Sequence, residues 1–244
     1  MKRFLFLLLI LAARTSIAQT TLLSGTPYNP LVAPRAPSTE WSTVFESLSR
    51  FETVSEGVGS SVAISTGGCS VSLGGVVASS AQISMGLFAG AFKYGSNENV
   101  LFSVDIDFEG SDASCNIFIG LDNVITIDKT TGVDYTENHI GFKITNSGGG
   151  AVSVYGSQSD GTESATSALT TISAGDQVQL CFRYNTTGSV DYWYRKTGGS
   201  WSSATNLSTH IPTLLPKATL GVSSVNTTST VSFTVSGLNI KSWQ

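Results

Sequence analysis

Three carboxylates stand at alternate positions in one short stretch of the chain: Asp105, Asp107 and Glu109. Only 12% of the 244 residues are charged, so this concentration of acids needs a chemical reason. Alternate residues of a β-strand point to the same side of a sheet, so the three carboxylates would share one face. Such a face suits three roles: calcium coordination, cleavage of a glycosidic bond, or the solvent-facing side of a strand.

The residues between the acids favour the third role. Large apolar side chains alternate with the polar ones through the same stretch, at Phe102, Val104, Ile106 and Phe108. This period-two pattern predicts a strand that buries one face and presents its carboxylates to solvent. An exposed acidic face of this kind also suits one wall of a ligand groove.

The calcium interpretation has two forms. The motif D-x-D-x-E-G beginning at Asp105 resembles the opening of an EF-hand loop, but the twelfth position holds Asn116 where a bidentate glutamate is required. A looser site remains an alternative, because carboxylates could converge from loops. The candidate calcium ligands are then Glu109, Asp112 and Asp122. We expect no other cofactor.

A second candidate for chemistry is a tryptophan on the polar side of a predicted hairpin at residues 190–206. In the segment "VDYWYRK", Trp193 shares a face with Arg195, whereas Tyr192 and Tyr194 point to the other side. An indole on a hydrophilic face can stack on a sugar ring. The alternative is that this face is covered and Trp193 belongs to a core. The predicted ligand-binding residues are Trp193, Arg195, Asp107 and Glu109.

The two histidines, His139 and His210, are isolated in the sequence. Neither has a neighbour that would complete a metal site or a Ser-His-Asp triad. We expect His139 to be a surface residue at a strand edge.

The elements that must position these residues are strands. From about Val54 onward, eleven to fourteen short period-two runs are separated by turn-forming segments rich in glycine, serine and asparagine. This pattern predicts an all-β fold, a two-sheet antiparallel jelly-roll sandwich. One short N-terminal helix is expected at about residues 39–50, where apolar residues follow helical spacing: Trp41, Val44, Phe45 and Leu48.

The N-terminus predicts a secreted protein. Lys2 and Arg3 precede an apolar run that is too short to span a bilayer, and Ser16 and Ala18 suit a signal-peptidase site. The expected domains are a signal peptide at 1–18, a proline-rich leader with the short helix at 19–53, and the sandwich at 54–244. We therefore expect an extracellular or virion-surface location, with no membrane association after signal cleavage.

The charge and the cysteines narrow the function further. Removing residues 1–18 removes three basic residues and no acid, so the remaining 10 basic and 17 acidic residues give a net charge of −7. An acidic chain without basic clusters argues against nucleic-acid partners. Cys69, Cys115 and Cys181 leave two alternatives open, one disulfide or three buried thiols.

The order of elements in the C-terminal half resembles that of concanavalin A-like jelly-roll domains. A strand ending in a turn ("QVQLCFRYNTTGS") is followed by the hairpin and by a terminal strand ("VSFTVSGLNIKSW"). The resemblance spans residues 54–243. It implies a superfamily that includes laminin-G-like modules, legume-type lectins, β-glucanases and virion surface domains.

Within that superfamily, the retaining β-glucanases carry E-x-D-x-E on one strand. The resemblance places Asp105 in the nucleophile position, Asp107 in the middle and Glu109 in the acid/base position. This sequence departs from the pattern, because Asp105 is one methylene shorter than glutamate. The segment before it, "AFKYGSNENV", also lacks the tryptophans of that clan.

These observations favour a non-enzymatic β-sandwich that acts in glycan binding, adhesion or assembly, with a glycan or a surface protein as its partner and homo-oligomerisation as a further expectation. Two alternatives remain. One is a glycoside hydrolase of the jelly-roll β-glucanase type, with Asp105, Asp107 and Glu109 as its catalytic residues. The other is a purely structural surface or capsid-associated subunit.

Overall fold

A computed structural model describes most of the chain from residue 39 onward. The described residues are 39–43, 51–65, 68–86, 99–110, 114–123, 125–146, 150–213, 215, 217–225, 228 and 230–243. The predicted signal peptide, the first part of the leader and the candidate calcium ligand Asp112 lie outside them. The part of the chain that is described contains no helix that could cross a membrane.

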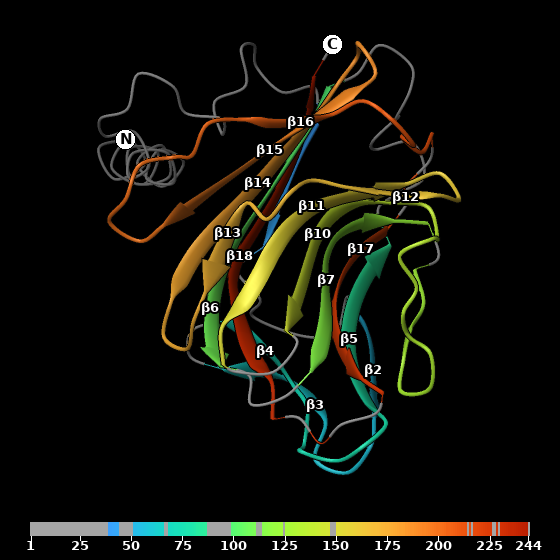
Figure 1. Ribbon diagram of the computed structural model, residues 1–244, viewed down its shortest axis with the longest axis vertical. Helices are drawn as coiled ribbons and strands as arrows, with labels where there is room; N and C mark the ends of the chain where they lie inside the picture. The colour runs from blue at the N-terminus through green and yellow to red at the C-terminus, as the bar shows by residue number, and fades with distance from the viewer. Residues whose placement is uncertain are drawn as a thin grey trace, which may run out of the picture.

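The described residues form two large antiparallel sheets that pack face to face (Figure 1). We call the first sheet A. From edge to edge its strands are β16 (Thr205–Leu207), β15 (Ser189–Lys196), β14 (Gln177–Asn185), β6 (Asn99–Gly110), β18 (Ser232–Trp243), β4 (Gly68–Ser72) and β3 (Ser61–Ser65). One further strand, β1 (Thr39–Thr43), pairs with β18.

Sheet B forms the second layer. From edge to edge it contains β12 (Glu163–Ala165), β11 (Val152–Ser159), β10 (His139–Asn146), β7 (Cys115–Asp122), β17 (Lys217–Ser224), β5 (Ser79–Gly86) and β2 (Glu52–Glu56), and β13 (Thr170–Ile172) pairs with β11. The short strands β8 (Ile127–Asp128) and β9 (Gly132–Val133) pair with each other in the segment between β7 and β10. The prediction of a two-sheet antiparallel sandwich is confirmed.

The main core lies between the sheets, and strand alternation fills it. The even-numbered apolar residues of β6, from Val100 to Phe108, are all buried there, as the sequence pattern predicts. Tyr192 of sheet A also points inward, and its hydroxyl donates to the backbone oxygen of Ser157 in sheet B at 3.1 Å. The remaining residues of β6, including Asp105 and Asp107, face outward.

The predicted helix at residues 39–50 is wrong for its first part, because Thr39–Thr43 forms β1. The register of β18 gives the reason. β4 pairs with only its first residues, Ser232–Val235, and β1 pairs with Leu238–Ser242 further along. Backbone groups at a strand edge offer hydrogen bonds to an extended segment, and this pairing overrides the helical spacing of the apolar residues. The rest of the predicted helix, residues 44–50, lies outside the described residues.

The number of strands also exceeds the eleven to fourteen expected. The described residues form eighteen strands, of which five contain only two or three residues and thirteen are longer. Such short bridges leave no period-two pattern in a sequence. Two of the longer strands, β1 and β2, begin before residue 54, the expected start of the sandwich.

The three cysteines are buried and none of them forms a disulfide, which decides between the two alternatives. Cys69 and Cys115 lie in the main core, whereas Cys181 lies on the outer face of sheet A. Burial raises the pKa of the Cys69 thiol to about 11 and that of Cys181 further, so both thiols stay protonated at neutral pH.

Candidate ligand groove

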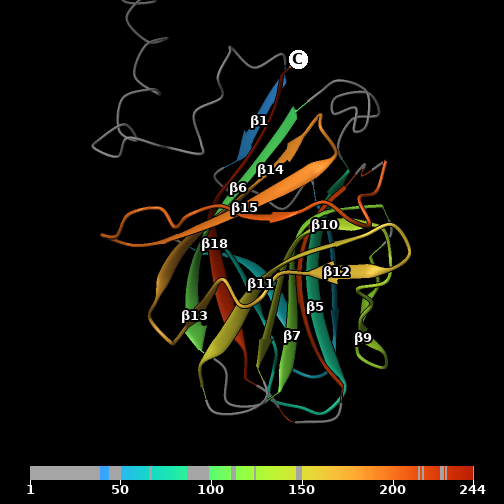
Figure 2. The same ribbon diagram turned by 45° about the horizontal axis from the view of Figure 1, so that its top comes forward.

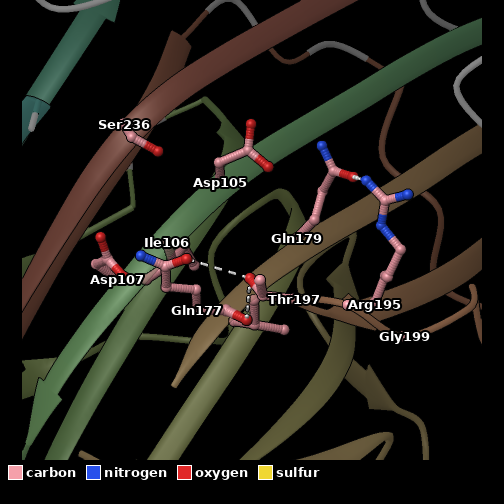
Figure 3. A pocket seen from close by; sticks show the side chains of 11 residues that line it. Asp105, Ile106, Asp107, Gln177, Gln179, Arg195, Thr197, Gly199 and Ser236 are labelled. Atoms are coloured by element: carbon pink, nitrogen blue, oxygen red, sulfur yellow. Dashed lines mark hydrogen bonds between the residues drawn. The ribbon is translucent and has the colours of Figure 1, made fainter. Parts of the chain in front are cut away.

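A groove of about 540 Å³ lies on the outer face of sheet A (Figure 3). Its floor is formed by β6 and β14, and the connection between β15 and β16 forms one side. The lining residues are Asp105, Ile106, Asp107, Gln177, Val178, Gln179, Arg195, Thr197, Gly198, Gly199 and Ser236. Most of these side chains are polar, so the groove offers hydrogen-bonding groups rather than an apolar surface.

The first row of side chains across the groove joins three neighbouring strands. In the sheet register, Gln179 of β14 pairs with Arg195 of β15 on one side and with Asp105 of β6 on the other. Nη2 of Arg195 donates to Oε1 of Gln179 at 2.7 Å. This bond occupies the amide oxygen, so the amide nitrogen of Gln179 is on the side of Asp105, as Figure 3 shows.

The electrostatics of this row centre on Asp105, which is half-buried. Burial raises the pKa of Asp105, and the side chain of Gln179 and the charge of Arg195 partly counteract that rise. The carboxylate has room because its partner on β18 is Gly237. A Cβ added at position 237 would lie 3.3 Å from Oδ2 of Asp105.

The second row lies one step further along the same strands. Gln177 of β14 pairs with Asp107 of β6. The hydroxyl of Thr197 donates to the backbone oxygen and to Oε1 of Gln177, both at 3.3 Å. These bonds fix the turn after β15, in which Gly198 has a positive φ of 78° that glycine adopts without strain. Asp107 is half-buried and has no hydrogen-bond or ion-pair partner within the described part of the chain.

Glu109 stands apart from the other two acids, although all three share the outer face. The hydroxyl groups of Ser232 and Thr234 donate to its two carboxylate oxygens at 2.7 Å and 2.9 Å, which holds Glu109 against β18 and outside the groove lining. Double displacement needs two carboxyl groups about 5 Å apart at one site. Of the two outer acids, Asp105 lines the groove, whereas the carboxylate of Glu109 is bonded to β18 and does not line it.

The prediction that Trp193 is an exposed sugar platform is wrong in this structure. Trp193 does share the face of Arg195, but it is only 1% exposed. It belongs to a small apolar cluster on the outer face of sheet A with Leu101, Cys181 and Trp243, and the half-buried Trp201 packs against this cluster. The guanidinium of Arg195 lies 5.0 Å from the ring centre of Trp201. Arg195 therefore contacts the cluster and also lines the groove, whereas Trp193 packs within the cluster and does not line the groove.

The candidate calcium ligands Glu109 and Asp122 are not brought together. Glu109 lies near the end of β6, whereas Asp122 is the last residue of β7 in the other sheet. The chain leaves β6 just after Glu109 and enters β7 at Cys115. Asp122 is at the other end of β7, roughly 23 Å from Cys115 at about 3.3 Å per residue. Among the described residues, no group of three or more histidine, cysteine, aspartate or glutamate side chains is placed to hold a metal ion.

His139 is buried, which corrects the expectation of a surface histidine. It lies on the outer face of sheet B under residues 125–138 and is 0% exposed. Its Nδ1 lies 2.7 Å from the backbone oxygen of Glu137, and its Nε2 lies 2.8 Å from Oγ of Ser157. Because a carbonyl oxygen only accepts, the ring donates from Nδ1 to Glu137. Burial lowers the pKa of His139 to about 4.

The sequence interpretation missed four polar lining residues: Gln177, Gln179, Thr197 and Ser236. The alternation in "QVQL" places both glutamines on one face of a strand, so their direction was available from the pattern. The pairing of β14 with β6, which sets the glutamines beside the aspartates, was not available. That pairing joins residues about seventy positions apart in the chain.

No protein-family model matches the sequence, and no curated protein matches it. Solved structures match the fold. The globular domain of T. cruzi calreticulin aligns with a TM-score of 0.56 at 12% identity, over 82% of this chain and 86% of that chain. Peanut lectin, solved with a nine-residue peptide, gives a TM-score of 0.53 at 10% identity, over 84% and 97%.

A phage protein gives a similar match. The CBM2 module of an evolved Dit protein from Lactobacillus casei BL23 phage J-1 aligns with a TM-score of 0.53 at 7% identity, over 84% of this chain and 96% of that chain. At these identities the likeness concerns the arrangement of strands and not the side chains. Two antiparallel sheets in this order, matched along most of the chain, establish that the protein has the concanavalin A-like lectin/glucanase fold.

Proposed function

We propose that this protein is a non-enzymatic carbohydrate-binding domain that holds its ligand in the groove of sheet A. The observation that carries the proposal is the pair of polar rows, in which carboxylate, amide, hydroxyl and guanidinium groups from three strands and one turn converge on about 540 Å³. A sugar presents many hydroxyl groups, each a donor and an acceptor. A lining that alternates acceptors such as Asp105 with donors such as Arg195 matches that chemistry.

Hydrogen bonds within the protein already order the side chains of the groove. Gln179 is 7% exposed and is fixed by Arg195, and Thr197 fixes the turn at its side. Side chains that are already ordered lose less conformational entropy on binding. The likeness to a structure called a lectin and to one called a CBM2 module supports the proposal at the level of the fold.

The proposal extends to the setting of the protein. The N-terminal pattern supports secretion or display on a virion surface, where a glycan or a glycosylated surface protein is the partner. Binding without hydrolysis is favoured, because Glu109 lies outside the groove and is held by Ser232 and Thr234.

The test is a glycan array probed with the mature chain, followed by calorimetry on the glycan that binds best. Asp105→Asn should weaken binding at least tenfold, since the central acceptor of the first row loses its charge. Glu109→Gln is the matched control on the same strand and face, and it should bind like the wild type. An array without any binder, or an affinity that Asp105→Asn leaves unchanged, would overturn the proposal.

A further inference from the structure

The charges within the groove are unevenly distributed. Asp105 and Asp107 both line it, two residues apart on β6, and Arg195 is the only basic residue among the described residues that line it. Arg195 lies two strands away from Asp105 in the register, with Gln179 between them. With strands about 4.8 Å apart, the backbones of these two charged residues are roughly 10 Å apart, so the guanidinium compensates the aspartates weakly.

Other cations on the described part of this face are engaged or remote. Arg183 pairs with Asp191 at 3.1 Å. Lys241 is paired in register with Leu101, four residues from Asp105, which is roughly 13 Å along the strand at about 3.3 Å per residue. The β6 side of the groove therefore carries two half-buried carboxylates, and no cation of the described residues contacts either of them.

The hydrogen-bond partners sharpen this asymmetry. Asp105 faces the amide nitrogen of Gln179, whereas Asp107 has no partner within the described residues. Gln177, which lies opposite Asp107, is bonded through its amide oxygen to Thr197, and its amide nitrogen is on the side of Asp107 without forming a hydrogen bond to it. Asp107 is thus the strongest unused acceptor in an otherwise pre-arranged groove, and a ligand group that only donates would satisfy it.

We propose that the groove selects sugars with a free, protonated amino group, and that Asp107 is the residue that determines this selectivity. This inference rests on the proposed function and identifies the class of its ligand. Residues i and i+2 of a strand have Cα atoms about 7 Å apart, which leaves space for an ammonium between the carboxylates of Asp105 and Asp107. Hydrogen bonds between two charged groups are stronger than those of a neutral hydroxyl. An acidic sugar meets repulsion at the same place.

The experiment compares three soluble tetrasaccharides by calorimetry at a pH where a sugar amine is protonated. They are a β-1,4-linked glucosamine tetramer, its fully N-acetylated form and a tetragalacturonate. We expect the glucosamine tetramer to bind at least tenfold more tightly than the acetylated one and the acidic one not to bind. Raising the salt concentration should reduce the preference for the amine, because it depends on charge.

Two variants test whether Asp107 causes the preference for the glucosamine tetramer. Asp107→Asn keeps the shape of the side chain, and it should weaken binding of the glucosamine tetramer at least tenfold more than it weakens binding of the acetylated tetramer. Glu109→Gln removes an acid from the same face outside the groove and should keep the preference. A circular dichroism spectrum identical to that of the wild type establishes that Asp107→Asn is folded, and the salt series on the wild type tests the inference without any variant.

The outcomes separate this inference from the function on which it rests. Equal affinity for the amino and acetylated tetramers would overturn the inference and leave carbohydrate binding standing. A preference that persists in Asp107→Asn would also overturn it. If none of the three tetramers binds and the glycan array is empty, both the inference and the proposed function fail.

Discussion

The outer faces of the two sheets, whose strands Figure 2 shows obliquely, differ in what covers them. On sheet B, residues 125–138 fold back over the strands and cover a hydrophobic cluster of Phe118, Ile125, Ile127 and Tyr135. On sheet A, an apolar cluster around Trp193 occupies one part of the face, and the polar rows beside it remain open as the groove. Similar strands therefore support one covered face and one that is open at the groove.

The covered face keeps its polar groups in contacts within the protein. His139 is bound by Glu137 and Ser157, and Lys143 bonds Glu163 at 2.8 Å and lies 4.3 Å from the ring centre of Tyr135. On the open face, Asp107 has no such partner within the described residues. Buried polar groups need partners within the protein, whereas those of an open groove remain available to a ligand.

The largest change in the free energy of unfolding is expected for a substitution in the apolar cluster beside the groove. Trp193→Ala should lower the free energy of unfolding by about 3–5 kcal/mol, because it removes a large side chain that is 1% exposed. Urea denaturation at neutral pH measures this. Trp201→Ala, at a half-buried position of the same cluster, should have a smaller effect. If Trp193→Ala were as stable as the wild type, the cluster would not be part of the folded core.

The second prediction concerns the pH dependence of the covered face. The pKa of His139 is lowered to about 4, so His139 destabilises the fold as the pH falls below about 6.5, the usual value for histidine. Asp122 lies opposite His139 in the register, and burial raises its pKa to about 6. Its folded pKa is above the unfolded one, so Asp122 has the opposite effect and stabilises the fold on acidification.

The variant Asp122→Asn separates the contributions of His139 and Asp122 to the pH dependence of stability. Between pH 7 and pH 5, His139 should remove about 2 kcal/mol of stability and Asp122 should restore about 1 kcal/mol. The wild type should thus lose less than Asp122→Asn, which should show the full loss of about 2 kcal/mol. Urea denaturation at the two pH values measures both. Equal losses in the two proteins would show that Asp122 does not titrate in this range.

The smallest expected effect is on the open face. Glu109→Gln should change the free energy of unfolding by about 0.5 kcal/mol or less, since the side chain is exposed and an amide oxygen still accepts one hydroxyl. Neither the wild type nor the variant should release reducing ends from β-1,3 or β-1,4 glucans. Release by the wild type that disappears in Glu109→Gln would restore the glycoside hydrolase interpretation.

The sequence by itself determined the features that depend on neighbours along the chain. Alternation in β6 predicted which side chains enter the core and that Asp105 and Asp107 face outward, because the period of a strand is fixed by its geometry. The same rule placed Trp193 and Arg195 on one face and Tyr192 on the other. The resemblance to concanavalin A-like domains, based on the order of strands, agreed with the fold.

Only the tertiary structure decided what lies above each face and which strands are neighbours. A period-two pattern does not distinguish a face open to solvent from one covered by another part of the chain, so the burial of Trp193 and His139 could not be predicted. The pairing of β1 with β18 replaced a predicted helix for the same reason. The groove itself exists because β14 lies between β6 and β15, and such pairing between distant segments depends on the packing of the whole sandwich rather than on local sequence.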